Sequence, residues 1–491
     1  MIKMNQQTQK NQFTFFFSPY AIFMGGLFSF VVFLCGETIF SQDTPSYSGY
    51  PPSATNTTTP AGTPTSTANN TTTDPAIKAE LEKATKAFNE SKFPEALEIL
   101  KSLSAQHPEI APPRIVLAQM FAMAKLGDAV RANLELGTEE TPDDPEAYLL
   151  LGEISLRQRN LTAAELLLRR AHEVLNKYAA NPQRKRNLTS SLLRVLSEFY
   201  EVRQRWAHME KCIDDQIKFD GQNATFLRRK GIAIFRQTTD QQNRDNEAKQ
   251  LFLQADQLDQ TNKDATQKGL PADAAMSQLY LTRGDKDKAR VHLESALKSY
   301  PQSKEVLALS IQMRVSDDKL EEARPLADKL LSDDPTLAAA KRLRATVGLY
   351  LREYPLAEKL FQELLLESPT DAQAQNGLAL ALCEQDVPEK VKRALEYAVD
   401  NVRKNQNSGE FWGTLGWVQY KANMIDEAER SLKQSVATGQ LNAATTYYHA
   451  RLAVKANKID DAKRFLNIAL QGNNQFAKRR EALQLQQELS K

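Results

Sequence analysis

The sequence predicts an all-α solenoid built from stacked helical hairpins. The main support is that alanines recur along the chain at a fixed interval of about 34 residues, the length of one repeated helix pair. The alanines separated by one or two such intervals are Ala96 and Ala164; Ala289, Ala323 and Ala357; and Ala394, Ala428 and Ala462. A fixed interval of this length indicates repeated helix pairs, because each pair buries its apolar face only against its neighbours.

Prolines and composition support the same fold class. Pro301, Pro335 and Pro369 recur at the same interval as the alanines, and each is expected to close the second helix of a hairpin, because proline lacks a backbone donor. The 491 residues are 41% hydrophobic and 25% charged with only 19 glycines, as expected of a helical protein. A solenoid grows by adding units, so this length does not require several globular domains.

The chain starts with a short tail, residues 1–12, followed by an apolar segment over residues 13–35. As a continuous helix, the stretch from Phe13 to Leu34 would span roughly 33 Å, against about 30 Å of bilayer hydrocarbon. We therefore expect a signal peptide or a transmembrane anchor over residues 13–35. The best cleavage point, after Ser41, lacks two small residues, so whether the segment is removed stays open.

Charges on either side of the apolar segment predict its orientation. Lys3 and Lys10 precede it, and the next charges, Glu37 and Asp43, are acidic. Because positive charge is retained on the cytoplasmic side, we expect everything downstream to be exported. The expected location is therefore extracytoplasmic, either periplasmic or at the cell surface, with the chain anchored in the membrane or secreted.

Residues 36–75 are rich in Thr, Ser, Pro and Asn and contain almost no aliphatic side chain. Such a segment cannot bury enough apolar surface to offset the entropy of ordering it, so we expect a disordered linker. As a flexible coil it would hold the folded part roughly 30 Å from the membrane.

From about residue 76 to the C-terminus the chain resembles the tetratricopeptide repeat (TPR) family. One copy of the pattern reads Trp412, Leu415, Gly416, Ala428 and Leu432, and another reads Tyr148, Leu151, Gly152, Ala164, Leu168 and Ala171. The resemblance implies a right-handed superhelical solenoid of ten or eleven hairpins. Small residues at the recurring positions allow the two helices of a hairpin to approach closely, while large residues fill the space between units.

The repeats divide into regular and irregular stretches. Residues 76–178 contain three regular units and residues 270–475 contain the later ones, while the spacing breaks over residues 179–269. There we expect degenerate TPR-like hairpins with polar insertions at Arg236–Asn246 and Thr261–Gly269, acting either as a hinge or as loop excursions. Residues 476–491 are polar and are expected to form a capping helix.

The sequence offers no constellation for catalysis. It has no glycine-rich phosphate loop, no Gly-x-Ser-x-Gly elbow and no His-Glu-x-x-His motif, and its five histidines and three cysteines are scattered. We therefore expect a non-enzymatic protein with no catalytic, cofactor-binding or metal-binding residues and no small-molecule substrate. The net charge of +2 gives no reason to expect a nucleic-acid partner.

A binding groove is the remaining candidate site. The resemblance implies that first helices line the concave face with residues not used in packing, and aromatic rings beside fixed cations suit a peptide with an acidic or carboxylate feature. The alternative is that the aromatic residues only support neighbouring helices. The candidate groove residues are Arg342, Tyr350, Trp417, Tyr420, Lys421, Tyr447, Arg451 and Lys455.

TPR domains that bind chaperone C-termini use a Lys and an Asn on the first helix of the opening repeat. Leu81 and Thr85 occupy the matching positions here, so the resemblance does not extend to that carboxylate clamp. The leading hypothesis is a scaffold outside the cytoplasm, held at the membrane by its N-terminal segment, that binds unidentified protein partners within an envelope assembly. The alternatives are an accessory subunit of a cell-surface polysaccharide or secretion system, and a membrane-anchored adaptor facing the cytoplasm.

Overall fold

The computed structural model describes residues 75–107, 109–261, 269–471 and 475–490. Within these ranges the chain forms 23 α-helices, α2 to α24, and no β-strand. The predicted tail, apolar segment and linker, residues 1–12, 13–35 and 36–75, lie outside the described residues except for Pro75. No helix in the described ranges is both long and apolar enough to cross a membrane.

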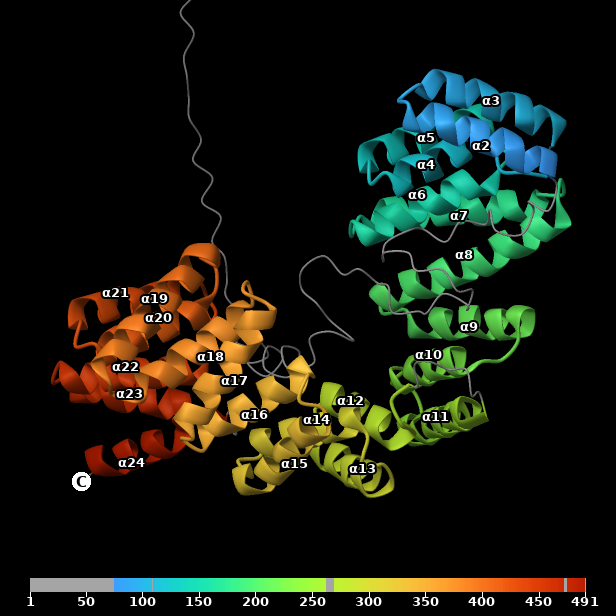
Figure 1. Ribbon diagram of the computed structural model, residues 1–491. Helices are drawn as coiled ribbons and strands as arrows, with labels where there is room; N and C mark the ends of the chain where they lie inside the picture. The colour runs from blue at the N-terminus through green and yellow to red at the C-terminus, as the bar shows by residue number, and fades with distance from the viewer. Residues whose placement is uncertain (1–74, 108, 262–268, 472–474, 491) are drawn as a thin grey trace, which may run out of the picture. The chain divides into compact units, whose positions relative to one another are not determined.

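The helices pair in chain order, and 22 of them, α2 to α23, form 11 consecutive hairpins followed by α24. Successive hairpins lie side by side along each part of the chain (Figure 1). The number agrees with the ten or eleven hairpins expected from the sequence. The structure is therefore the predicted all-α stack of helix pairs.

By contacts between residues, the chain divides into two compact units, whose described parts are residues 75–299 and 300–490. The helices of the first unit are α2 (Pro75–Asn89), α3 (Phe93–Gln106), α4 (Pro113–Met123), α5 (Gly127–Glu140), α6 (Pro145–Arg157), α7 (Leu161–Lys177), α8 (Pro182–Val202), α9 (Trp206–Asp220), α10 (Ala224–Phe235), α11 (Gln241–Thr261), α12 (Ala272–Arg283) and α13 (Lys286–Ser299).

The second unit contains five hairpins and the final helix. Its helices are α14 (Lys304–Ser316), α15 (Leu320–Asp333), α16 (Ala338–Tyr350), α17 (Tyr354–Glu367), α18 (Ala372–Cys383), α19 (Pro388–Lys404), α20 (Gly409–Lys421), α21 (Ile425–Ala437), α22 (Ala443–Lys455), α23 (Ile459–Leu470) and α24 (Arg479–Leu489).

The periodic alanines explain why the hairpins close. All eight lie on the second helix of a hairpin, and each is 0% exposed. On the facing first helices, Gly152 and Gly416 lie so close to a leucine that an added Cβ would come within 2.8 Å of Leu168 and 2.6 Å of Leu432. The separation in sequence between glycine and leucine is the same in both pairs, so the same close approach recurs in distant hairpins.

The turn inside every hairpin contains one residue in the left-handed backbone conformation, with a positive φ. Only one of these eleven positions is a glycine; the residues with positive φ are Ser91, Lys125, Arg159, Gln204, Asp240, Gly284, Asp318, Arg352, Asp386, Asn423 and Asn457. A left-handed conformation costs an ordinary residue free energy, whereas glycine adopts it readily. The turns recur once in each hairpin, but the spacing of glycines in the sequence does not reveal them.

The irregular region, residues 179–269, lies inside the first unit and contains the two longest helices described, α8 and α11, each of 21 residues. The expected insertion at Arg236–Asn246 is partly helical, because residues 241–246 begin α11. Asp245 explains this extension: it is 5% exposed and accepts hydrogen bonds from Tyr280 Oη at 2.9 Å and Arg283 Nη1 at 2.8 Å. Residues 241–246 of this insertion are therefore helical, while residues 262–268 of the second expected insertion lie outside the described residues.

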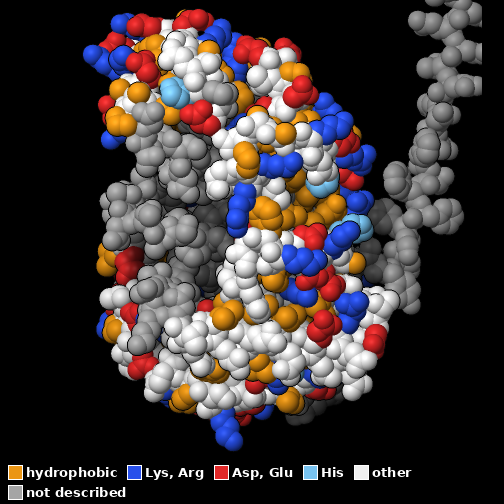
Figure 2. Space-filling model, turned by 90° about the vertical axis from the view of Figure 1, so that its right-hand side faces the viewer, with side chains coloured by type: hydrophobic (Ala, Val, Ile, Leu, Met, Phe, Trp, Pro, Cys, Tyr) orange, Lys and Arg blue, Asp and Glu red, His pale blue; other side chains and the backbone are white. Residues whose placement is uncertain are grey.

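Charged side chains are mixed on the outer surface. Figure 2 shows Lys and Arg interspersed with Asp and Glu on one face of the molecule, without a continuous field of one sign. This agrees with the small net charge of +2.

Candidate functional site

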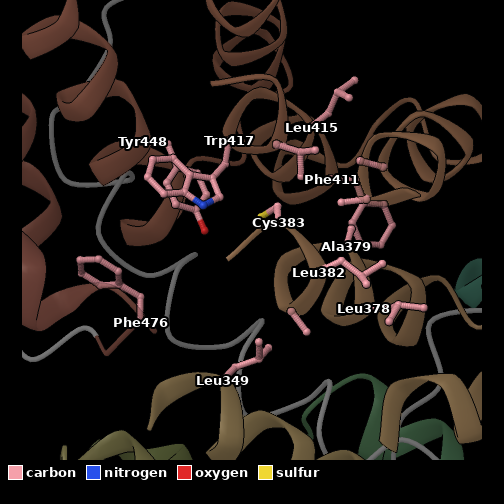
Figure 3. Packing of buried hydrophobic residues seen from close by; sticks show 14 of the residues in the cluster. Leu349, Leu378, Ala379, Leu382, Cys383, Phe411, Leu415, Trp417, Tyr448 and Phe476 are labelled. Atoms are coloured by element: carbon pink, nitrogen blue, oxygen red, sulfur yellow. The ribbon is translucent and has the colours of Figure 1, made fainter. Parts of the chain in front are cut away.

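Four aromatic side chains from two first helices gather in the second unit. Trp417 and Tyr420 come from α20, three residues apart and therefore on one helix face, and Tyr447 and Tyr448 come from α22. The indole of Trp417 stacks on Tyr448 at 4.6 Å and on Tyr420 at 5.2 Å, and it lies 6.1 Å from Tyr447. Figure 3 shows the stack of Trp417 on Tyr448, with Phe476 nearby. Three predicted groove residues thus belong to one aromatic cluster.

A buried carboxylate lies beside these rings. Glu384 immediately follows α18, and its side chain is 8% exposed. Its Oε1 accepts a hydrogen bond from Trp417 Nε1 at 2.7 Å, which holds the indole in place. Glu384 was not among the predicted site residues, because a lone glutamate in a helical turn gives no sequence signal.

Two of the predicted cations are already paired with carboxylates. Lys421 Nζ lies 2.5 Å from Asp386 and 3.9 Å from Glu384. Arg342 Nη2 lies 2.7 Å from Asp371, the N-cap residue of α18. Arg342 therefore links α16 to the start of the next first helix, and Lys421 does not offer the unpaired positive charge that the sequence suggested.

The chain's own C-terminal segment enters the same place. Phe476, which is 5% exposed, lies 5.9 Å from the ring of Tyr447. Two residues later, Lys478 Nζ donates to Glu384 Oε2 at 2.6 Å and to Tyr354 Oη at 3.2 Å. The segment contacts Tyr354, Glu384 and Tyr447, and Glu384 in turn contacts Trp417 and Lys421. We call these five residues the aromatic–acidic site.

Electrostatics in the aromatic–acidic site favour a bound cation. Burial alone lowers the pKa of Lys478, but the carboxylate of Glu384 outweighs this effect, so the pKa of Lys478 is raised and the ammonium stays charged. Burial raises the pKa of Tyr447 to about 12 and also raises that of Tyr354, so both phenols are neutral near pH 7. The carboxylate and neutral phenols accept hydrogen bonds from an ammonium group.

A second carboxyl, that of Glu410, lies in the first turn of α20. Glu410 accepts a hydrogen bond from Asn376 Nδ2 on α18 at 3.1 Å, and burial raises its pKa. Within the described ranges no Lys or Arg forms an ion pair with Glu410. The raised pKa favours the uncharged form of this carboxyl, so burial reduces the negative charge that Glu410 contributes.

Tyr350 is the last residue of α16, and it lies close to the C-terminal segment. Together with Arg352, Phe476 and Glu481 it lines a cavity of about 200 Å³. Arg352 Nη2 pairs with Glu481 at 2.9 Å, which ties α24 to the turn between α16 and α17.

The last two predicted groove residues lie on α22. Arg451 is partly buried, and its Nε atom is buried without a hydrogen-bond partner in the described structure. Lys455 is exposed at the C-terminal end of the helix. The structure thus places Trp417, Tyr420, Lys421 and Tyr447 in one cluster, and leaves Arg342 and Lys455 outside it.

The cysteines and metal-ligating residues form no further centre that the structure describes. Cys212 and Cys383 are both free thiols. Across the described ranges, no three His, Cys, Asp or Glu side chains are grouped closely enough to hold a metal ion.

Comparison with known proteins agrees with the repeat geometry. Residues 122–180, from the end of α4 through α7, match the tetratricopeptide repeat model. The chain contains tetratricopeptide repeats. This TPR assignment confirms the resemblance seen in the sequence and indicates a protein–protein interaction scaffold, a class that is typically non-catalytic.

Solved structures similar to this TPR chain share little sequence with it. A tetratricopeptide repeat protein from Parabacteroides merdae is 12% identical, with 55% of this chain and 99% of that protein covered and a TM-score of 0.42. PilF from Pseudomonas aeruginosa is 21% identical, with 44% and 96% covered and a TM-score of 0.31. YrrB, a TPR protein with an unusual peptide-binding site, is 20% identical, with 40% and 97% covered and a TM-score of 0.25. None of the curated proteins matches the chain.

Proposed function

We propose that this TPR chain is a non-enzymatic scaffold that binds a segment of a partner protein at the aromatic–acidic site. The observation that carries the proposal is the seating of Phe476 and Lys478, an aromatic and a cationic side chain of one short segment, on residues from several hairpins. A surface that accepts one such segment has the shape and the hydrogen-bonding groups for another.

A protein segment fits the site better than a carbohydrate does. Trp417 and Tyr447 are only 4% and 2% exposed, so their ring faces are covered by other side chains and offer little area to a sugar. The accessory subunit of a polysaccharide system remains the second candidate, because the aromatic cluster motivates it. Binding of the chain to a glycan array would favour that candidate, and an empty array would exclude it.

We further propose that the scaffold works outside the cytoplasm within an envelope or membrane-associated assembly. The support is the order of Lys3, Lys10 and the apolar residues 13–35, followed by acidic residues. A reporter fused after Lys491 tests this orientation. Activity of the reporter only in the cytoplasm would favour the cytoplasmic-facing adaptor instead.

Photo-crosslinking in the host tests the binding site. A crosslinkable amino acid at Tyr420, which is partly exposed beside Trp417, should capture a discrete protein partner. The matched control is the same amino acid at Leu166 on α7, which is 60% exposed and far along the chain from the site. Recovery of no partner at Tyr420, or of the same proteins at both positions, would contradict the proposed site.

A further inference from the structure

The C-terminal segment makes contacts that a capping helix does not need. A cap has to cover the apolar face of the last hairpin, and α24 does this by burying Ala482 and Leu485 while it packs against α23. Lys478, in contrast, reaches Glu384 and Tyr354, which precede it by 94 and 124 residues in the chain. The segment before α24 therefore spans several hairpins instead of covering one.

Phe476 and Lys478 act as two anchors of this segment. Phe476 is 5% exposed in the aromatic cluster, and the Lys478 side chain is 12% exposed with its ammonium group between Glu384 and Tyr354. The spacing of an aromatic residue and a lysine two positions later places one side chain against rings and the other against a carboxylate. This is the arrangement of a bound peptide ligand.

The charge of the site selects the kind of ligand. Lys421 already pairs with Asp386 and lies 3.9 Å from Glu384. Without Lys478, the buried Glu384 would therefore have only the hydrogen bond from Trp417 Nε1 and this more distant lysine as partners. A buried carboxylate in this state favours an incoming cation, because the desolvation of the carboxylate is offset only by a close opposite charge. An acidic segment would instead meet repulsion.

We propose that Phe476 and Lys478 are a resident occupant of the aromatic–acidic site, and that the partner is a segment with an aromatic residue followed two positions later by Lys or Arg, which displaces them. This inference rests on the proposed function, since it specifies the partner and the regulation of the same site. An occupant in the same chain has an effective concentration in the millimolar range for a short connection, so the wild-type site is masked until a stronger or more abundant competitor arrives.

The test uses the full chain and a labelled peptide with the sequence of residues 475–489. The double variant Phe476→Ala/Lys478→Glu should release the resident occupant, because Glu at 478 is repelled by Glu384, while Ala482 and Leu485 still hold α24. Fluorescence anisotropy should show the peptide binding the double variant at least tenfold more tightly than the wild-type chain. A peptide with Glu in place of Lys should lose at least tenfold in affinity for the double variant.

Lys463→Glu is the matched control, because Lys463 is exposed on α23 and the substitution makes the same change of charge outside the site. The control should bind the labelled peptide as weakly as the wild type does, and circular dichroism should show the same helical content in all three chains. If the double variant loses helical content, Lys478→Gln replaces it in the test. This substitution removes the positive charge without adding repulsion, and it should still increase peptide binding several-fold.

Two outcomes would overturn the inference: equal peptide affinity for the opened and wild-type chains, or binding that is indifferent to the peptide's lysine. Failure of the proposed function looks different. If the peptide binds the opened chain but crosslinking at Tyr420 captures no protein, the resident occupant is real and the scaffold role fails. If crosslinking captures partners equally in the wild-type chain and the double variant while the peptide binds neither, the scaffold role stands and the inference fails.

Discussion

The substitution Gly416→Ala should destabilise the second unit relative to Gly348→Ala, although both place the same methyl group on a first helix. Alanine is favoured over glycine in a helix by about 1 kcal/mol, so each substitution gains that amount. At Gly348 the nearest atom to the new Cβ is Arg344 Nη1 at 3.5 Å, an ordinary contact, and the gain should remain. At Gly416 the new Cβ would lie 2.6 Å from Leu432 Cγ and 3.3 Å from Ala428 O.

The contact at Gly416 sets the magnitude of the difference. Leu432 is 1% exposed and Ala428 is 0% exposed, so neither can move aside freely, and overpacking of this kind costs about 1–3 kcal/mol. The two variants should therefore differ by about 1–3 kcal/mol, and Gly348→Ala should be the more stable one. For a unit of this size, that difference corresponds to roughly 2–12 °C in Tm.

Tryptophan fluorescence can report the second unit alone. The chain has three tryptophans, and replacing Trp206 by Phe leaves Trp412 and Trp417, both on α20. Thermal melts of the two glycine variants in this background give the Tm difference without assuming that the whole solenoid unfolds in one step. Equal melting temperatures, or a higher Tm for Gly416→Ala, would show that the helix pair does not depend on this close approach.

The turns and the buried titratable groups give three further predictions. Lys125→Gly should stabilise the first unit by about 0.5–1 kcal/mol in denaturant unfolding, because Lys125 has φ 59 and glycine adopts this conformation at less cost; an unchanged midpoint would contradict this. Burial lowers the pKa of His449, so the unfolded chain binds the proton more readily; stability should fall as the pH drops below about 6.5, and His449→Gln should remove part of that dependence. Cys383 is 0% exposed and burial raises its pKa, so peptide mapping after iodoacetamide treatment should find it modified only when the second unit unfolds.

The sequence predicts the repeat fold well because packing recurs along the chain. Ala357, Ala428 and Ala462 are all fully buried on second helices, and the same steric requirement acts at each of them. Such a requirement leaves a periodic signal in residue size. Prediction of the fold therefore needs no knowledge of contacts between distant residues, since each hairpin contacts only its neighbours.

Features that do not repeat were harder to predict. The hairpin turns need a residue with positive φ, but the chain uses Lys125, Arg159 and Asn457 there as readily as Gly284, so residue type carries little information. In the irregular region, the polar residues that suggested a loop begin α11, because Asp245 finds buried partners on α12. That pairing depends on the tertiary structure and leaves no local pattern.

The charge of the candidate site is the clearest case in which contacts distant in sequence decide the chemistry. Lys421 beside Trp417 suggested an acidic ligand when the helix was considered alone. In the folded unit, Asp386 and Glu384 from the preceding hairpin surround Lys421, and Lys478 from the C-terminal segment then adds the cation that Glu384 accepts. Both carboxylates come from the turn between α18 and α19, one hairpin before the aromatic helix α20. The stacking of one hairpin on the next therefore decides which charge the site prefers in a ligand. The preferred charge is positive, the opposite of what α20 suggests by itself.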